Sequence, residues 1–357
     1  MTRDDLDFWD RATGDATCDH VEDCCHHDRS CANEASCTAR GCCWDPHGPA
    51  NWCSGIPHVC DNATQCSGHG RCTNDHLCEC DEGFEGIRCE DTAVTVVHVV
   101  QSCHLDVGFD GSILMVLNEY FTKYIPNAIQ TAKQMRADTT LPSATWRSNF
   151  MLQSYYVSLY LDCPPSLGLM CPNSTAVAEF KAAAVRGDIH WHAFPHNAEL
   201  EMGSPMLLEA GINLTHRIDA SLGLAPKRVL SQRDVPGISR AAIPVLKRAG
   251  VRAISVGVNT ASMYPRVPKI FRWKDENSAT EIFAMWHSRG YGGYSVSEAV
   301  RVKGLSHVLV TDWNGDNQGP SNPATIKTRL QAIQKEFPNA VSVPPRLRQG
   351  TPAAPAK

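Results

Sequence analysis

Thr92-Ala-Val-Thr-Val-Val-His-Val-Val-Gln-Ser102, followed directly by Cys103-His104-Leu105-Asp106-Val107-Gly108, is the stretch that decides the fold of most of this chain. The first part is a nearly continuous run of β-branched residues, which is typical of a strand buried on both faces. Such strands occur in parallel sheets that helices cover. We therefore expect an α/β domain with the polar groups of residues 103–108 at the carboxyl end of its first strand.

The alternation of strand and helix continues along the chain beyond Asp91. Further strands are predicted at 188–194, 228–232, 252–258 and 307–311, and helices at 113–135 (kinked or ended at Pro126), 175–186, 205–222, 238–249 and 323–336. Strands separated by helices of this length indicate parallel β-α-β units, hence a β/α barrel or a doubly wound sheet. In both folds, chemistry takes place where the strands end, at their carboxyl edge.

Cysteine usage divides the chain near residue 91. Of the 17 cysteines, all but Cys103, Cys163 and Cys171 lie between Cys18 and Cys89. Small domains that cannot build a sufficient core use such density, and the disulfides persist only in an oxidising compartment. We therefore expect a secreted or lumenal protein, and the acceptor sequons at Asn62, Asn173 and Asn213 agree with that compartment. Cys163 and Cys171 are expected to form a loop disulfide.

Five segments are expected: a leader at 1–17, a cysteine-rich domain at 18–57, a second at 58–91, the α/β domain at 92–343 and a disordered tail rich in Pro and Ala at 344–357. The N-terminus lacks the apolar core of a signal peptide. Either the start of the reading frame is missing or misassigned, or export uses another route; of these, we expect an incomplete N-terminus.

Charge and hydropathy exclude two classes of partner. The chain has 33 basic and 38 acidic residues and a formal net charge of -5, with no run of like charge that would follow a phosphate backbone. Nucleic acid is therefore not expected as a partner. No stretch of 18 or more apolar residues occurs, so no integral membrane segment is predicted. The oligomeric state stays open.

The second cysteine-rich segment has the spacing C-x5-C-x5-C-x5-C-x-C-x8-C from Cys60, and a glycine and an aromatic residue in its last loop. This pattern resembles the EGF-like family. The resemblance implies the pairs Cys60–Cys72, Cys66–Cys78 and Cys80–Cys89, and no calcium, because His58-Val59 stands where calcium-binding members have an acidic pair. A zinc site is the alternative, although no C-x2-C pairs are present.

The first cysteine-rich segment contains Cys37-x4-Cys42-Cys43-Trp44 and then Trp52-Cys53. It resembles the trefoil (P-type) module in part, since the spacing from Cys31 to Cys37 is shorter than trefoils have. Its eight cysteines can pair among themselves. Both modules are usually binding or spacer units.

The sequence His104-Leu-Asp106 places two ligand types two residues apart, so that on an extended strand end both side chains point the same way and could hold one divalent ion. The alternative is a loop His with an Asp that caps the next helix. With Gly108 and Phe109, the motif resembles the end of the first strand in glycoside hydrolase family 38, the zinc-dependent retaining α-mannosidases. The resemblance implies a Zn²⁺ site with His104 and Asp106 as ligands.

Two further segments resemble this family in the same order. Ser231-Gln-Arg-Asp234-Val-Pro-Gly237-Ile-Ser239 is similar to a block with D-x-x-G-x-S, which puts Asp234 at a substrate-binding position, and Gly315-Asp316-Asn317 is similar to a Gly-Asp-Asp segment near the site. Asp312 and Asp316 are our acid/base candidates by position, with helix capping as the alternative. Cys103 beside the metal motif could be a ligand, but a cysteine at a strand end is more often simply buried.

The chain departs from the family at the nucleophile. Where the family has an Asp, this chain reads Phe194-Pro-His196-Asn197-Ala198-Glu199-Leu-Glu201. We expect Glu199 to replace the missing Asp as ligand or nucleophile, and His196 to replace a metal ligand. His192 is a further candidate ligand, or one polar position of a strand.

Three hypotheses follow for the function. The first is a secreted zinc-dependent glycosidase that cleaves a glycan or glycoprotein. The second is a non-catalytic extracellular protein that binds glycans or proteins through its modules and a degenerate hydrolase domain. The third is a metal-dependent deacetylase or other hydrolase on a similar barrel, because H-x-D alone does not fix the reaction.

Overall fold

The computed structural model describes residues 43–45, 52–54, 63–73, 78–85, 88–141, 147–235, 238–263, 265–287 and 290–343. The chain forms two compact units, a small unit of residues 1–93 and a large unit of residues 94–357.

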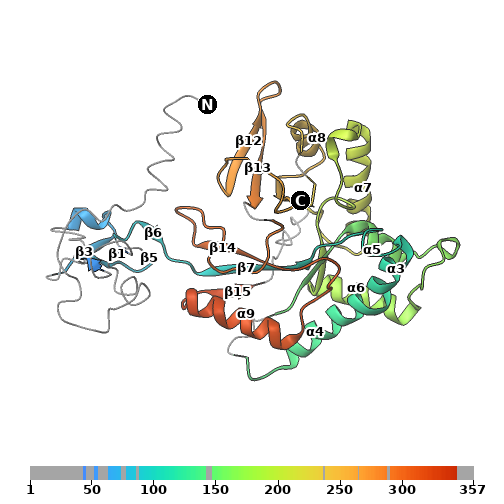
Figure 1. Cartoon of the computed structure of the whole chain (residues 1–357), viewed down its shortest axis with the longest axis horizontal. Helices are drawn as coiled ribbons and strands as arrows, with labels where there is room; N and C mark the ends of the chain where they lie inside the picture. The colour runs from blue at the N-terminus through green and yellow to red at the C-terminus, as the bar shows by residue number, and fades with distance from the viewer. Residues whose placement is uncertain are drawn as a thin grey trace, which may run out of the picture. The chain divides into compact units, whose positions relative to one another are not determined.

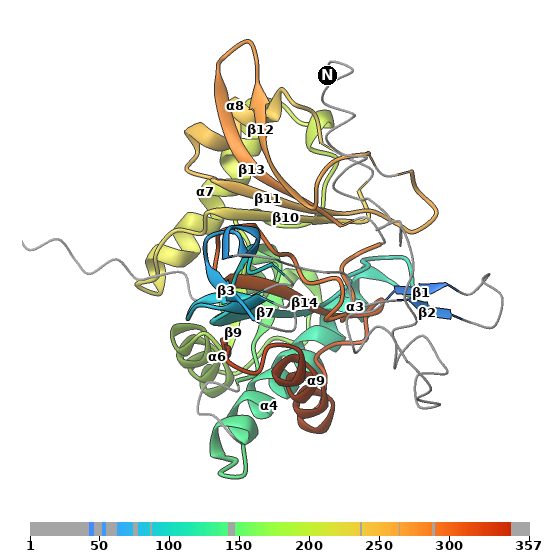
Figure 2. The same cartoon turned by 90° about the vertical axis from the view of Figure 1, so that its left-hand side faces the viewer.

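Short antiparallel strand pairs form the described part of the small unit, drawn in blue in Figures 1 and 2. Its elements are β1 (Cys43–Asp45), β2 (Trp52–Ser54), the 3-10 helix η2 (Ala63–Cys66), β3 (Gly70–Cys72), β4 (Cys78–Cys80), β5 (Phe84–Glu85) and β6 (Asp91–Thr92). The pairs are β1 with β2, β3 with β4 and β5 with β6.

Sulfur takes the place of an apolar core in this unit. Disulfides join Cys66 to Cys78 and Cys80 to Cys89, and both Cys66 and Cys89 are fully buried. Cys72 is disulfide-bonded as well, whereas Cys60 lies outside the described residues. The resemblances to EGF-like and trefoil modules, and the segment boundaries within 1–93, stay predictions.

Parallel strands form the centre of the large unit. The strands are β7 (Val96–Cys103), β8 (Phe150–Leu152), β9 (Ile189–Trp191), β10 (Val229–Arg233), β11 (Ala253–Gly257), β12 (Ile270–Asp275), β13 (Thr280–His287), β14 (His307–Asn314) and β15 (Val341–Val343). They form sheets of order β14-β7-β15, β10-β11-β13-β12 and β8-β9, in which only β12 is antiparallel to its neighbour.

The helices of the large unit cover these sheets. They are α3 (Ile113–Glu119), the π-helix η3 (Tyr120–Tyr124), α4 (Ile125–Ala137), α5 (Ser154–Leu161), η4 (Pro165–Leu167), α6 (Ser174–Arg186), η5 (Leu200–Met202), α7 (Pro205–Ser221), α8 (Ala242–Arg248) and α9 (Pro323–Glu336). In both views α4, α6 and α9 lie on the same side of β7 and β14 (Figures 1 and 2). The large unit is a mixed α/β domain with parallel sheets; the closed barrel stays a prediction.

Pro126 does not end the helix that the sequence predicts over 113–135. The helix runs from α3 through a π-helical turn into α4, and Pro126 stands in the first turn of α4. Proline has no N–H to give to the carbonyl four residues earlier, and its ring would clash with that carbonyl in a regular α-helix. The wider π turn, in which the Ile125 N–H bonds to the Tyr120 carbonyl, accommodates the proline.

Several elements differ from the sequence prediction. The first buried strand begins at Val96, because Asp91 and Thr92 pair with β5 in the small unit. The helix predicted from residue 238 begins at Ala242. The prediction missed β8, α5, the β12–β13 hairpin and β15. The strands β8 and β15 have three residues each, too few to establish a period of two, and they exist because they pair with β9 and β7.

Within the described part of the chain, no helix has the length and apolar character that crossing a bilayer requires.

Candidate metal centre and active site

The carboxyl ends of β7 and β14 bring two sequence-distant loops together. The two strands are parallel and in register up to the pair of Cys103 with Asn314. Beyond this pair, the Asn317 N–H donates to the His104 carbonyl oxygen at 2.8 Å. Because these backbone bonds continue past the last ladder pair, the loop that carries His104 and Asp106 is fixed against the loop that carries Asp316.

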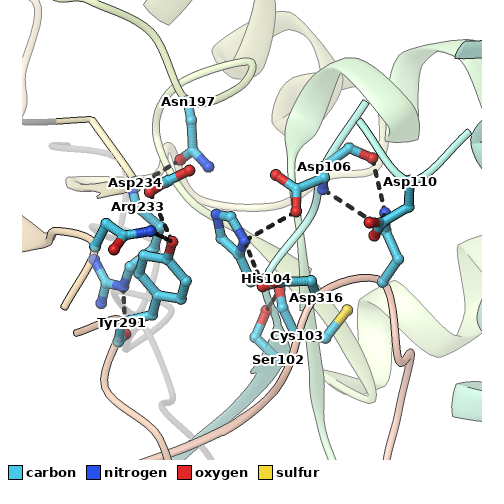
Figure 3. A network of polar contacts seen from close by, with 12 residues as sticks. Ser102, Cys103, His104, Asp106, Asp110, Asn197, Arg233, Asp234, Tyr291 and Asp316 are labelled. Atoms are coloured by element: carbon cyan, nitrogen blue, oxygen red, sulfur yellow. Dashed lines mark hydrogen bonds and ion pairs between the residues drawn. The ribbon is translucent and has the colours of Figure 1, made fainter. Parts of the chain in front are cut away.

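Two carboxylates converge on one nitrogen of the His104 ring in this corner (Figure 3). Its Nδ1 atom is 2.9 Å from Asp316 Oδ1 and 3.5 Å from Asp106 Oδ2. The imidazole is buried, with 2% of its side chain exposed, while Asp106 is 17% and Asp316 50% exposed. The His104 Nε2 atom is buried and has no hydrogen-bond partner among the described residues. Such an orphan atom costs free energy unless a bound group satisfies it.

Burial shifts the pKa of the Asp106 carboxyl. The pKa of Asp106 is raised, first because its surroundings exclude water; the neighbouring His104 acts in the opposite direction, while Asp316 raises the pKa further. Two carboxylates that crowd one site repel each other, and a cation would relieve this repulsion.

The three residues fit a divalent cation by two measures. One ligand atom from each of His104, Asp106 and Asp316 lies within 4.8 Å of the others. Ligand atoms bound to a common zinc ion at about 2.0–2.2 Å in tetrahedral geometry are roughly 3.3–3.6 Å apart; the 3.5 Å separation of Asp106 Oδ2 from His104 Nδ1 lies in this range, whereas the 2.9 Å separation of Asp316 Oδ1 is a hydrogen-bond distance. An imidazole with two carboxylates is a donor set that suits Zn²⁺ and other first-row metals.

Two further polar residues, Tyr291 and Asp234, lie near the His104 imidazole. Tyr291 stacks on His104 with ring centroids 4.1 Å apart and an interplanar angle of 19°. The Tyr291 hydroxyl donates to Asp234 Oδ1 at 2.7 Å and accepts from Asn259 Nδ2 at 3.1 Å. Asp234 has a φ of 64°, in the left-handed region that non-glycine residues rarely adopt. This strained turn at the end of β10 points Asp234 toward the same site as His104 (Figure 3).

Arg233, the residue before Asp234, holds this turn in place from the protein interior. It is buried and donates to the carbonyl oxygens of Tyr291 and Ser255, at 2.7 and 2.9 Å, and its guanidinium lies 4.5 Å from the centre of the Trp313 ring. The groups that accept hydrogen bonds from the Arg233 guanidinium in the described part of the chain are neutral, and burial lowers its pKa. Arg233 therefore ties β10, β11 and the loop of Tyr291 together directly beneath the site.

The structure brings four of the predicted site residues together: His104, Asp106, Asp234 and Asp316. Asp316, predicted as an acid/base residue, lies against His104 in the metal-type cluster. The H-x-D motif, the block around Asp234 and the segment around Asp316 thus meet at one place, although Gly237 of the second block lies outside the described residues.

Asp312 does not belong to the site. The predicted strand ends at Thr311, which would put Asp312 in the end loop, but β14 continues to Asn314. Side chains alternate along a strand, so Asp312 points into the helix layer, where Arg329 pairs with it and Gln101 Nε2 donates to it at 3.0 Å. The structure thus places Asp312 in an ion pair with Arg329, away from His104 and Asp106.

Glu199 and His196 are not part of the cluster either. Glu199 is exposed, and its pKa is raised by partial burial and by its neighbour Glu201. The His196 ring lies 6.1 Å from both Tyr155 and Phe194, measured between centroids, and it is absent from the metal-type cluster of the described residues. The strand end turns here so that Asn197 is the residue beside Asp234 (Figure 3), and its Oδ1 accepts the Arg233 N–H at 3.0 Å.

The interior histidines are structural in this arrangement. His192 is buried, its Nδ1 accepts the Phe194 N–H at 3.2 Å, and burial lowers its pKa to about 3.

Cys103 is the free cysteine of the described residues; its Sγ lies 3.0 Å from the Tyr120 hydroxyl, and burial raises its pKa to about 11. Cys103 is not among the residues of the metal-type cluster in the described part of the chain.

Sequence reasoning missed Tyr291, Asn197 and Arg233. Tyr291 follows β13, a strand that the prediction did not contain, so nothing placed it at a strand end. Asn197 lies in the segment 194–201, in which Glu199 is the predicted residue. Arg233 lies in the block around Asp234, and no sequence pattern indicates its burial or its long-range hydrogen bonds.

The predicted loop disulfide and two of the predicted glycosylation asparagines lie within the described residues. Cys163 and Cys171 are joined by a disulfide. Asn173 is exposed and caps α6 by accepting the Ala176 N–H, and Asn213 is exposed on α7. Asn62 lies outside the described residues.

Comparisons with known proteins give structural matches only. The sequence matches no protein-family model and no curated protein. The structure is similar to an α-mannosidase from Enterococcus faecalis V583, with a TM-score of 0.51 and 17% identity over 71% of this chain and 28% of the mannosidase. The large unit has a glycoside hydrolase-like fold.

Two weaker matches were also found. A glycosyl hydrolase family 38 protein from Enterococcus faecalis gives a TM-score of 0.44 at 14% identity, covering 71% of this chain and 26% of that one. A 4-alpha-glucanotransferase from Thermococcus litoralis gives 0.44 at 10% identity, with 70% and 37% covered. This chain therefore spans between a quarter and two fifths of the length of each of these proteins.

Proposed function

We propose that this chain is part of a secreted, zinc-dependent glycoside hydrolase of the α-mannosidase type that acts on a glycan or glycoprotein. One observation carries the proposal: a buried imidazole on whose Nδ1 atom two carboxylates converge at the carboxyl end of β7, in a domain whose fold is similar to that of an α-mannosidase. The disulfides of the small unit are compatible with secretion.

His104, Asp106 and Asp316 would hold the metal. A bound Zn²⁺ would supply a Lewis acid that binds sugar hydroxyls and stabilises charge that develops on them. The protein's contribution is to hold the three side chains in place before the metal arrives. It does so through the strand pair β7–β14 and through the stacking of Tyr291 on His104.

Asp234 is the proposed acid/base or substrate-binding carboxylate. It lies outside the metal-type cluster, and the Tyr291 hydroxyl and the strained turn orient it. A protonated carboxyl at this position could give its proton to a leaving oxygen, and a carboxylate could take a proton from an incoming hydroxyl. The Asn259 amide, which donates to the Tyr291 hydroxyl, leaves the hydroxyl proton free for Asp234.

Asn197 favours a second candidate function. Retaining glycosidases need two carboxyl groups about 5 Å apart, one of them as nucleophile. Here an uncharged amide stands beside Asp234 (Figure 3), and an amide is a poor nucleophile. The second candidate is therefore a metal-dependent glycan-binding domain that recognises the same sugars without cleaving them.

The finer features of the architecture are proposals as well. We infer that the sheets continue into a closed β/α barrel, because the Ala193 N–H bonds to the Val229 carbonyl between β9 and β10, and a bridge joins Gly293 to Trp313 on β14. The small unit is proposed to contain an EGF-like module at 58–91 and a trefoil-like module at 18–57, which would act as spacers or binding units.

Zinc binding and hydrolysis of aryl α-mannosides test the proposal together. The full chain is dialysed against Zn²⁺, its bound metal is measured, and turnover is followed by release of the aryl group. We expect about one Zn²⁺ per chain and turnover, both lost in His104→Gln. The matched control is His307→Gln, at the opposite end of β14, where the residue is exposed and its ring contacts the His98 ring.

Each outcome separates the candidates. A wild-type protein that binds no Zn²⁺ would contradict the zinc proposal. Zinc binding without turnover, combined with retention of the protein on immobilised mannose that His104→Gln abolishes, would select the glycan-binding function. Equal loss of zinc in both histidine variants would show that His104 is not the ligand.

A further inference from the structure

Asn317 occupies the tightest point of the loop that follows β14. Its φ of 47° lies in the left-handed region, which asparagine tolerates better than most residues. Its own N–H donates to the His104 carbonyl at 2.8 Å, and its carbonyl accepts from the Tyr124 hydroxyl. The backbone of Asn317 is therefore held on both sides, which fixes the direction of its side chain.

The side-chain amide of Asn317 grips the backbone of Asp106. Its Oδ1 accepts the Asp106 N–H at 3.1 Å, and its Nδ2 donates to the Asp106 carbonyl at 3.0 Å. The same Nδ2 donates to Asp110 Oδ2 at 3.1 Å. Because the N–H of Asp106 must meet an acceptor and its carbonyl a donor, only one orientation of the amide satisfies all three bonds.

This double contact resembles one rung of a β-ladder, made by a side chain where the ladder has ended. It spans 211 residues of sequence and joins the β14 loop that carries Asp316 to the β7 loop that carries Asp106. Besides it, the bonds between the two loops in the described part of the chain are those from the His104 ring to Asp316, from the Asn317 N–H to the His104 carbonyl and from Asn317 Nδ2 to Asp110.

From these contacts we infer that Asn317 is a positioning residue for the metal centre: its amide holds the backbone of Asp106 so that Asp106 and Asp316 face His104 together. The inference rests on the proposed function, because it concerns the same cation site. It assigns to the third residue of Gly315-Asp316-Asn317 a role that requires an amide, since a carboxylate at this position has no proton to give to the Asp106 carbonyl or to Asp110.

Two substitutions separate the amide from other roles of Asn317. Asn317→Gly removes the side chain and leaves a residue that adopts a positive φ without strain, so that backbone strain does not confuse the result. Asn317→Asp keeps the shape and the acceptor, but it replaces the donor by a charge that faces Asp110 and the Asp106 carbonyl.

The matched control is Asn322→Gly. Asn322 lies five residues further along and caps α9 by accepting the Thr325 N–H at 2.9 Å. Glycine is an acceptable N-cap, so this variant should lose little stability and no metal affinity.

The experiment measures two quantities on the full chain. The first is the Zn²⁺ dissociation constant, from equilibrium dialysis. The second is hydrogen exchange in the peptide covering residues 104–111, in metal-free protein. We expect Asn317→Gly to weaken zinc binding by about 10- to 100-fold, as loss of an orienting partner does at other metal sites, and to speed exchange of this peptide about fivefold. Asn322→Gly should leave both unchanged.

Asn317→Asp decides between positioning and simple charge. Positioning predicts weaker zinc binding in this variant, because the donor bonds are lost. Attraction between the added carboxylate and the cation predicts tighter binding, and this result would overturn the inference. So would unchanged exchange at 104–111 in Asn317→Gly, or faster exchange with an unchanged zinc dissociation constant. A wild-type protein that binds no zinc would contradict the proposed function itself. The exchange measurement would then still report whether the Asn317 amide holds the Asp106 backbone.

Discussion

The hydroxyl group of Tyr291 offers the sharpest test of how the site works. Tyr291→Phe removes one oxygen and leaves the ring, so the stacking on His104 with centroids 4.1 Å apart is retained. What is lost is the bond from the hydroxyl to Asp234 at 2.7 Å and the bond that it accepts from Asn259 at 3.1 Å. The variant therefore separates the orientation of Asp234 from the support of the imidazole.

The magnitude follows from the charge of the acceptor. A hydrogen bond to a charged group contributes about 1.5–3 kcal/mol, and each 1.36 kcal/mol corresponds to a factor of ten in rate. If Asp234 acts on the substrate, kcat/KM should fall by about 10- to 150-fold in Tyr291→Phe. The zinc dissociation constant should not change, because neither lost bond involves the metal-type cluster.

Tyr294→Phe is the matched control on the same loop. Its hydroxyl donates to the Arg329 carbonyl at 2.7 Å, outside the site. This variant should lose about 1 kcal/mol of stability, measured by urea unfolding, and keep its kcat/KM on aryl α-mannosides. The reasoning is refuted if Tyr291→Phe keeps wild-type kcat/KM, if both variants lose the same activity, or if Tyr291→Phe loses zinc.

Two further predictions concern stability. Burial lowers the pKa of both His190 and His192 to about 3, so the native protein leaves them neutral while the unfolded chain protonates them below about pH 6.5. The stability that these groups contribute is therefore complete above pH 6.5 and falls toward pH 3, by up to about 1.4 kcal/mol per pH unit for each histidine. Urea unfolding at pH 7, 6, 5 and 4 should give a shallower slope of unfolding free energy against pH for His192→Gln than for the wild type. An identical slope would contradict this assignment. Asp219→Asn should destabilise the protein by about 3–5 kcal/mol, because it leaves the buried ammonium of Lys227, 2.9 Å from the Asp219 carboxylate, without its counter-ion. The exposed pair of Glu209 is the control, and Glu209→Gln should cost less than about 1 kcal/mol; equal losses in the two variants would show that burial is not what matters.

Local patterns predicted the strands and helices that are long and regular. The β-branched run that became β7 and the helices α6, α7 and α9 were placed within a few residues, because their patterns extend over several turns or strand periods. Short elements such as β8 were missed, since three residues carry no period and depend on the pairing partner.

The same distinction holds for the site. The H-x-D motif could be read from two neighbouring positions, because a strand end directs residues 104 and 106 to the same side. The length of β14 could not be read, and a strand three residues longer than expected moved Asp312 from the site to the helix layer. Asn197 and Tyr291 depend on how two loops turn after their strands, which is decided by long-range bonds to Arg233.

By itself, the sequence determined the α/β class, the cysteine-rich composition of the first ninety residues and the two chemically distinctive positions His104 and Asp106, because each of these is carried by neighbouring residues. Only the tertiary structure decided that Asp316 completes their cluster, that Asn317 holds Asp106, and that an amide rather than a carboxylate stands beside Asp234. These contacts join residues more than 200 positions apart or fix a loop through a buried arginine. No local pattern contains that information, since the parallel pairing of β7 with β14 creates it.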